Sequence, residues 1–240
     1  MVKNHQKRIA APKHWPIKRK ENKFITRTSP GPHPINRSIT LSLLIKEILK
    51  YAKTQREVRN ILYLGKIKVN NTIRKDPGFP IGILDVISIE DTKENYRLFI
   101  NKDNKFIIHK IDQKESHIKP LKIINKTTVK GKKTQINLID GRNILVPKDT
   151  YKVQDTVLYD LEKKDLTEHI KLEKGALVYL IDGKQAGTFG VVEEIIPSKE
   201  TSQATVTFSN GKNKYTTLRS YAYAIGKGKS AISIPTQNEN

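Results

Sequence analysis

The sequence predicts a multidomain, mainly β protein with one small α+β module and a basic N-terminal arm. Residues 1–37 carry ten Lys or Arg and five prolines but little apolar periodicity, which is typical of an arm. Residues 54–71 change from a helical to an alternating apolar period, which indicates a helix joined to a strand. From Tyr96 onward, turn signals separate short β-like segments, which favours a β architecture over βαβ units.

The charge of the chain indicates a polyanionic partner. Its 240 residues include 45 Lys or Arg and 24 Asp or Glu, so the formal net charge is +21. Such an excess repels itself unless a polyanion is near, which favours nucleic acid as the partner. No apolar run approaches the roughly 20 residues that span a bilayer, and the N-terminus lacks the apolar core of a secretory signal. We therefore expect a soluble intracellular protein with no membrane partner.

Metal, cofactor and catalytic chemistry have no support in the sequence. Cysteine is absent, and the six His are scattered without ligand-like spacing. No Ser-His-Asp, Cys-His or paired-carboxylate pattern is visible. We expect no cofactor, no bound metal, no catalytic residue and no small-molecule substrate.

The arm, residues 1–37, is expected to bind nucleic acid. A run of cations can be a merely solvated tail, but interleaved aromatic residues favour a segment that becomes ordered on RNA. Trp15, next to His14, could stack on a base or anchor the arm to the protein, and we expect the first. The RNA-contacting residues predicted in the arm are Lys7, Arg8, Lys13, His14, Trp15, Lys18, Arg19 and Arg37.

The α+β module is predicted at residues 38–100. A first helix is expected from Ser38, capped by Ser38 or Thr40, because apolar residues recur at three- and four-residue spacing through Ala52. Thr54 and Glu57 have the spacing of a capping box, in which each side chain accepts a hydrogen bond from the other residue's backbone N–H. A second helix should therefore begin at Thr54.

The second helix should have an apolar side and a basic side. At about 100° per residue, its apolar residues gather on one side. These are Val58, Ile61 and Leu62, and the opposite side holds Arg56, Arg59, Asn60 and Tyr63. Tyr63 fits two roles equally, stacking on a base or covering the edge of the domain core. Gly65 can supply the left-handed residue that ends the helix.

A basic strand is predicted after Gly65, with a turn at Asn70-Asn71 and a closing strand at residues 85–89. Its alternation should direct Ile67, Val69 and Ile73 to one side and Lys66, Lys68 and Arg74 to the other. Helix and strand would then form two walls of one RNA-binding face, whose guanidinium groups suit paired contacts to phosphates. The residues predicted to form this face are Arg56, Arg59, Lys66, Lys68, Arg74 and Lys75.

This stretch, TQREVRNILYLGKIKVNN with the later DVIS, resembles the S-four RNA-binding domain. That family has a capped basic helix, then G-K-V-x-V-N-G, then a strand that begins D-x-I. Asn71 stands where the family usually has Gly, and Asn tolerates a positive φ at small cost. The resemblance implies RNA binding without specifying a task.

Two β domains are predicted in the rest of the chain, at residues 101–172 and 173–240. Their expected hairpin turns include Asp140-Gly141, Asp182-Gly183 and Asn210-Gly211. The segment KGALVYLIDGKQAGTFGVVEEI, residues 174–195, resembles the KOW motif. Lys184 in this segment, with Lys227 and Lys229 in the GKGKS that follows, is predicted to approach RNA.

The whole chain resembles the archaeal and eukaryotic small-subunit ribosomal protein family S-four-e. APKHWPIKRK, PGPHPINRS, the S-four stretch, the KOW stretch and TTLRSYAYAIGKGKSAISIP agree with it in order and spacing. The resemblance implies a C-terminal KOW domain folded as an SH-three-like barrel. It also implies a structural, non-enzymatic role in the cytoplasmic ribosome, with small-subunit ribosomal RNA and neighbouring small-subunit proteins as partners.

Two other functions remain as alternatives. Pseudouridine synthases also carry an S-four domain, and Asp140 would be the nearest candidate for a catalytic Asp, although it lies in an expected hairpin turn. A transcription or translation factor could use its KOW domain to bind polymerase. A phosphate-binding loop at GKGKS is rejected, because its first Gly would fall at Tyr223 and no helix is expected to follow.

Overall fold

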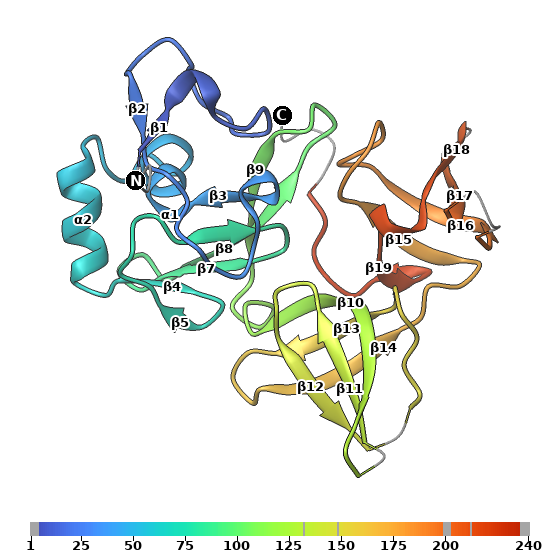
Figure 1. Ribbon diagram of the computed structural model, residues 1–240. Coiled ribbons are helices and arrows are strands. Elements are labelled where there is room, and N and C mark those ends of the chain that lie inside the picture. Colours follow the sequence, from blue (N-terminus) through green and yellow to red (C-terminus); the bar gives the residue numbers. More distant parts are fainter. Residues whose placement is uncertain (1–4, 132, 148, 199–202, 212, 236–240) are drawn as a thin grey trace. The chain divides into compact units, whose positions relative to one another are not determined.

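The computed structural model describes residues 5–131, 133–147, 149–198, 203–211 and 213–235, which Figure 1 shows as a ribbon. The chain forms two compact units that divide between His117 and Ile118. Strands make up most of the regular structure in the described residues, which confirms the mainly β prediction.

The N-terminal segment of the first unit folds onto the module that follows it. Strands β1 (Gln6–Lys7) and β2 (Phe24–Ile25) pair in an antiparallel sheet. Trp15 is 2% exposed, and its indole N–H donates to the carbonyl oxygen of Ser38 at 2.7 Å. The expectation that Trp15 stacks on RNA is therefore wrong. The ring anchors the segment instead, because its burial removes a large apolar surface from water.

Arg8 provides a second anchor, in the 3-10 turn Arg8–Ala10. Its buried guanidinium lies 3.0 Å from a carboxylate oxygen of Glu47 and 3.1 Å from one of Glu21, and it donates to the carbonyl oxygen of Lys18. A buried charge needs such partners to offset its lost hydration. The segment is thus ordered by the protein itself, whereas the sequence predicted an arm that RNA would order.

The first helical region begins later than predicted. Strand β3 (Ser38–Thr40) precedes a short helix α1 (Leu41–Leu43), which continues as a π-helical turn (Leu44–Ile48). Thr40 is the cap, since its hydroxyl accepts a hydrogen bond of 3.4 Å from an N–H of α1. Ser38 is not the cap, because it is the first residue of a strand.

Helix α2 (Gln55–Tyr63) starts at the predicted capping box. The hydroxyl of Thr54 accepts from the N–H of Glu57 at 3.2 Å, and the carboxylate of Glu57 accepts from the N–H groups of Thr54 at 3.4 Å and Lys53 at 2.8 Å. These hydrogen bonds, the one from Lys53 first, lower the pKa of Glu57 and keep it charged at the positive end of the helix dipole. Gly65, with φ +74°, follows the end of the helix as expected.

A five-stranded antiparallel sheet with the order β5-β4-β7-β8-β9 completes the module (Figure 1). Its strands are β4 (Ile67–Val69), β5 (Thr72–Ile73), β7 (Val86–Ile89), β8 (Glu94–Ile100) and β9 (Phe106–Ile111), while β6 (Pro80–Gly82) pairs with β3. The boundary expected at residue 100 falls within the β8–β9 hairpin, where Ile100 pairs with Phe106. β9 therefore belongs to this sheet.

The β4–β5 hairpin has the predicted turn. Asn70 and Asn71 have φ values of +50° and +59°, and Ile67 and Val69 are each 1% exposed. Ile73 was predicted to share their buried side but is 48% exposed. It lies on β5, a two-residue edge strand that reaches beyond the apolar face.

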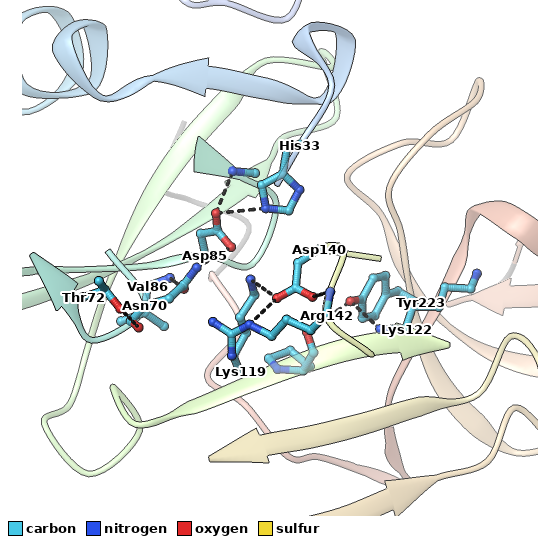
Figure 2. Close-up of polar contacts among 12 residues, drawn as sticks. His33, Asn70, Thr72, Asp85, Val86, Lys119, Lys122, Asp140, Arg142 and Tyr223 are labelled. Atoms are coloured by element: carbon cyan, nitrogen blue, oxygen red, sulfur yellow. Dashed lines mark hydrogen bonds and ion pairs between the residues drawn. The ribbon is translucent and has the colours of Figure 1, made fainter. Parts of the chain in front are cut away.

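Asp85 is a fully buried carboxylate that joins three parts of the first unit (Figure 2). It accepts hydrogen bonds from the N–H of Gly82 at 2.8 Å and from the side-chain amide of Asn70 at 3.1 Å. Asn70 in turn accepts from the N–H of Val86 at 3.0 Å, which fixes the start of β7. Nε2 of His33, in the segment before β3, lies 3.1 Å from the same carboxylate.

A polar cluster outside this core ties the loop after α1 to the sheet. Glu94 accepts hydrogen bonds from Tyr51 at 2.6 Å, Tyr96 at 2.8 Å and Lys110 at 2.7 Å. The hydrogen bond from Lys110, followed by those of the two tyrosines, lowers the pKa of Glu94 to about 2. Desolvation, followed by the hydrogen bonds with Tyr51 and Glu94, raises the pKa of Tyr96.

The second unit begins with a five-stranded antiparallel sheet, in the order β12-β11-β10-β13-β14. Its strands are β10 (Ile118–Val129), β11 (Lys133–Leu138), β12 (Asn143–Val146), β13 (Thr156–Asp160) and β14 (Asp165–Ile170). β10 pairs with β13 along its first part and with β11 along its second. The expected turn at Asp140-Gly141 joins β11 to β12, and Gly141 has φ +82°.

A six-stranded sheet follows, in the order β18-β17-β16-β15-β19-β20. Its strands are β15 (Ala176–Leu180), β16 (Phe189–Ile196), β17 (Thr205–Asn210), β18 (Asn213–Leu218), β19 (Ala222–Lys227) and β20 (Lys229–Ser230). Asp182-Gly183 lies in the connection from β15 to β16, and Gly183 has φ +86°. A 3-10 turn, Arg219–Tyr221, precedes β19.

The two sheets of the second unit share one apolar core. Leu158 and Ile170 of the first sheet belong to the same buried cluster as Val178 and Phe208 of the second. The ammonium of Lys122 on β10 also donates to three carbonyl oxygens of residues 219–222, at 2.5 to 3.3 Å. The division expected between residues 172 and 173 thus lies inside a continuous core, and the finer domain division remains a prediction.

Replacement of Trp15 by Ala should release the N-terminal segment. The variant loses both the buried ring and its hydrogen bond to Ser38, so the first unit should lose about 3–5 kcal/mol of stability. Denaturant unfolding and limited proteolysis check this, with new cleavage expected between residues 5 and 30. Lys13→Ala, at an exposed neighbouring position, is the control. An unchanged unfolding midpoint for Trp15→Ala would contradict the anchor.

Glu94 should make stability depend on pH in the acid range. Its pKa is about 2 in the folded chain and near 4.5 when unperturbed, so its contribution is complete above pH 4.5 and is lost as the pH falls toward 2. The melting temperatures of the wild type and Glu94→Gln should differ at pH 6 and converge toward pH 2. An NMR titration midpoint near 4.5 for the Glu94 carboxyl would refute this.

Candidate nucleic-acid interface

The exposed side of α2 carries two arginines that are available to bind a ligand. Val58 and Leu62 are 0% exposed and fix the orientation of the helix against the core. Arg56 and Arg59 are exposed on the other side, and neither has an ionic partner among the described residues. The helix therefore presents two fork-shaped guanidinium groups to solvent, which is the geometry that phosphate recognition uses.

The lysines of the β4 region lie beside acids that the sequence prediction did not include. The ammonium of Lys66 is 2.6 Å from a carboxylate oxygen of Asp91, and that of Lys68 is 2.7 Å from one of Glu90. Both acids are about half exposed. Exposed ion pairs of this kind contribute little to stability, so a phosphate can replace the carboxylate at small cost.

Arg74 and Lys75 extend this surface over aromatic rings. The guanidinium carbon of Arg74 lies 4.5 Å from the ring centre of Phe79, and the ammonium of Lys75 lies 5.4 Å from that of Tyr63. Tyr63 is 74% exposed, so it does not cover the core edge, which was one of its two expected roles. Base stacking by Tyr63 remains a prediction.

The predicted residues of the N-terminal segment divide into structural and exposed groups. Arg8 and Trp15 are buried, and Arg19 donates to the carbonyl oxygens of residues 9, 11 and 12 at 2.8 to 3.1 Å. The half-buried ring of His14 packs edge-on against Phe106 at 4.9 Å. Burial of Arg8 and Trp15 corrects their assignment to RNA, whereas RNA contacts by the partly exposed Arg19 and His14 remain predictions. Lys7, Lys13, Lys18 and Arg37 are exposed and remain candidates.

The second unit contributes exposed lysines at three predicted positions, Lys184, Lys227 and Lys229. Lys229 and Ser230 form strand β20, which pairs with β19, and the described residues after it, 231–235, are not helical. The GKS sequence therefore does not open a helix there, which confirms the rejection of a phosphate-binding loop. Two other lysines of this unit, Lys119 and Lys122, are buried.

Asp140, the candidate catalytic residue if the chain were a pseudouridine synthase, forms ion pairs with two cations (Figure 2). It is 6% exposed, and its Oδ2 lies 3.3 Å from the ammonium of Lys119 and 3.2 Å from the guanidinium of Arg142. A carboxylate held between two cations in this way is a structural charge at a turn and is not open to a substrate.

A cleft of about 520 Å³ lies between the N-terminal segment, the α1 region and α2. The residues that matter for its chemistry are Phe24, Arg27, Lys46, Glu47, Gln55 and Arg59. Except for Arg59, the sequence prediction did not include them. They lie far apart along the chain, and only the packing of residues 5–29 on the helices brings them together.

No other type of site emerges from the part of the chain that is described. It contains no cluster of three or more His, Asp or Glu side chains suited to hold a metal ion. Nor does it contain a helix with the length and apolarity needed to cross a membrane.

Comparison with known proteins identifies the family to which this chain belongs. Residues 92–166 match the model of ribosomal family S4e, and residues 2–36 match the RS4NT (NUC023) domain. Small ribosomal subunit protein eS4 of Aeropyrum pernix is 38% identical over 95% of this chain and 94% of its own length. The chain belongs to ribosomal family S4e.

Other S4e proteins agree with this assignment. The eS4 protein of Methanothermobacter thermautotrophicus is 38% identical over 97% of this chain and 96% of its own length. The crystal structure of 30S ribosomal protein S4e from Thermoplasma acidophilum has a TM-score of 0.70 and 27% identity, and the match covers 80% of this chain and 96% of that one. The predicted family is therefore confirmed.

Simultaneous replacement of Arg56 and Arg59 by Ala should weaken RNA binding without unfolding α2. Ala is the better helix former, and each lost charge-assisted hydrogen bond costs about 1.5–3 kcal/mol. The double variant should therefore bind small-subunit RNA well over tenfold more weakly, as measured by filter binding, and melt normally.

Val58→Asp is the contrasting variant. It places an unpaired charge in the core and should lower the melting temperature of the first unit before any effect on RNA is considered. Normal melting together with normal affinity for the double Ala variant would remove α2 from the RNA face.

Proposed function

We propose that this chain is a structural, non-enzymatic constituent of the small ribosomal subunit that binds ribosomal RNA. The observation that carries the proposal is the similarity over nearly the full length to proteins named small ribosomal subunit protein eS4. The RNA-binding face consists of Arg56, Arg59, Lys66, Lys68, Arg74 and Lys75.

The chemistry of folded RNA explains the composition of this face. An A-form helix has a deep, narrow major groove, so proteins bind its phosphates, 2′-hydroxyls and unstacked bases. A guanidinium pair on a helix and a row of lysines along a neighbouring strand supply charge to successive phosphates. Arg56 and Arg59 carry most of the binding, because they have no ionic partner among the described residues to displace.

The finer architecture also belongs to the proposal. The module that contains α2 and the β4–β5 hairpin acts as an S-four-type domain. The six-stranded sheet acts as the KOW domain with an SH-three-like barrel, and its exposed Lys184, Lys227 and Lys229 approach RNA. Neighbouring small-subunit proteins are the other partners, and the cytoplasmic ribosome is the location.

Two alternatives fit less well. A pseudouridine synthase would need an accessible catalytic Asp, whereas Asp140 is buried between Lys119 and Arg142. A transcription or translation factor with a KOW domain would bind polymerase and would not sediment quantitatively with small subunits. Sedimentation of a tagged chain, followed by mapping of its RNA crosslinks in purified small subunits, tests the proposal. A chain absent from the small-subunit fraction would refute it.

Binding to a small-subunit RNA fragment should weaken steeply with salt. Each phosphate that a cation neutralises releases counterions, and about five or more contacts are expected from the six residues of the face. A plot of log affinity against log salt concentration, measured from 50 to 200 mM, should fall with a slope of about −3.5 or steeper. A nearly flat plot would exclude the phosphate-binding face.

A further inference from the structure

The cleft beside α2 has the size and the wall chemistry of a nucleotide site. Its volume of about 520 Å³ is within the range of ligand pockets, roughly 300–1,000 Å³. Strand β2 and its neighbours form one wall, and the α1 region and the start of α2 form the other. All of these elements belong to the first unit.

The charges along the cleft favour an anion. Of its two acids, Glu47 is paired with Arg8, and Asp76 accepts the N–H of Gly78 at 2.9 Å. Three cations, Arg27, Lys46 and Arg59, line the same space, and none has an ionic partner among the described residues. A phosphate group is the anion that several converging cations of this kind bind best.

An exposed aromatic ring in the cleft wall favours a ligand that also contains a planar base. Phe24 is 48% exposed although it lies in a strand, and an edge-on contact with His5 at 5.2 Å between ring centres holds it in place. The ammonium of Lys23 lies 5.4 Å from the ring centre. An exposed ring fixed in this way is a stacking platform for an unpaired base.

Gln55 supplies a polar group that can contact the edge of such a base. Its side-chain oxygen accepts from the hydroxyl of Ser42 at 2.8 Å, and Ser42 in turn lies 3.4 Å from the hydroxyl of Thr26. This chain of hydrogen bonds orients the amide. Its NH₂ group has no hydrogen-bond partner among the described residues, so it is available to donate to an acceptor on the base.

We propose that the cleft binds one unpaired nucleotide of the RNA, with its base against Phe24 and Gln55 and its flanking phosphates at Arg27, Lys46 and Arg59. This inference rests on the proposed function, because it names the part of the RNA that one site would take. Arg59 lines the cleft and also belongs to the basic face, so an extruded nucleotide would enter directly beside the bound RNA backbone.

The test compares two RNA hairpins with the full-length chain. One hairpin is fully paired, and the other has the same sequence with a single unpaired uridine. The wild type should bind the bulged hairpin about tenfold more tightly. Phe24→Ala should remove most of this preference, since stacking on one base is worth about tenfold or more. Gln55→Ala should reduce the preference through the lost hydrogen bond to the base. Both variants should keep the wild-type affinity for the paired hairpin.

Matched controls lie outside the cleft lining. Ile9→Ala removes an apolar side chain that is 75% exposed in the same N-terminal segment, and Asn60→Ala removes an exposed amide from α2. Both should keep the preference for the bulge. Melting curves identify any variant that fails to fold. If a variant fails to fold, the wild type is tested instead with 4-thiouridine at the bulge. Its photo-crosslink should map to residues of the cleft lining, within 22–29, 43–59 or 76–78.

The outcomes separate this inference from the proposed function. Equal binding of both hairpins, or a crosslink only to other residues, overturns the nucleotide site while the phosphate face stands. Absence of salt-sensitive binding to either hairpin overturns the proposed function itself.

Discussion

The buried carboxylate of Asp85 is the constraint on which the first unit depends. A fully buried charge is tolerated only where its oxygens have donors, and here the donors come from the turn at Gly82 and the hairpin at Asn70, with His33 against one oxygen. A Cβ at Gly82 would lie 2.5 Å from the ring of His33, so any larger residue there would displace that ring from Asp85. One carboxylate thus sets the start of β7, the β4–β5 turn and the path of the chain before β3.

The path of the chain before β3 determines where the N-terminal segment lies. It therefore also determines which side chains line the cleft beside α2. The backbone before β3 passes so close to Gly78 that a Cβ there would lie 3.0 Å from the carbonyl oxygen of Arg27 and 2.5 Å from the side-chain hydroxyl of Ser29. With Trp15 and Arg8 buried at the other end, residues 5–29 become one wall of the cleft beside α2. The sequence predicted a flexible arm, and the structure places a wall there because the burial of two large side chains outweighs the loss of chain entropy.

Most predictions from local chemistry were accurate, although the start of the first helix and the burial of Ile73 were not, and predictions that depended on long-range partners failed. The capping box at Thr54, the turn at Asn70-Asn71 and the β character after Tyr96 follow from neighbours in the sequence. No local pattern reveals that Trp15 would reach Ser38 or that Arg8 would reach Glu47. The cleft contains residues of both kinds. Arg59 can be assigned to the exposed side of a helix from the sequence alone, whereas Arg27 and Lys46 line the cleft only because distant segments pack together.

Net charge therefore overstates the surface available to RNA. Several cations of this chain are internal supports: Arg8 bridges two acids, Lys119 neutralises Asp140, and Lys122 donates to the carbonyl oxygens of residues 219–222. Removal of such a cation leaves an uncompensated buried group, which costs more than the loss of an exposed pair. A cation's contribution to RNA binding must therefore be assessed from its burial and its partners. By that criterion Arg56 and Arg59 differ from Arg8 and Arg19, although all four have the same charge in the sequence.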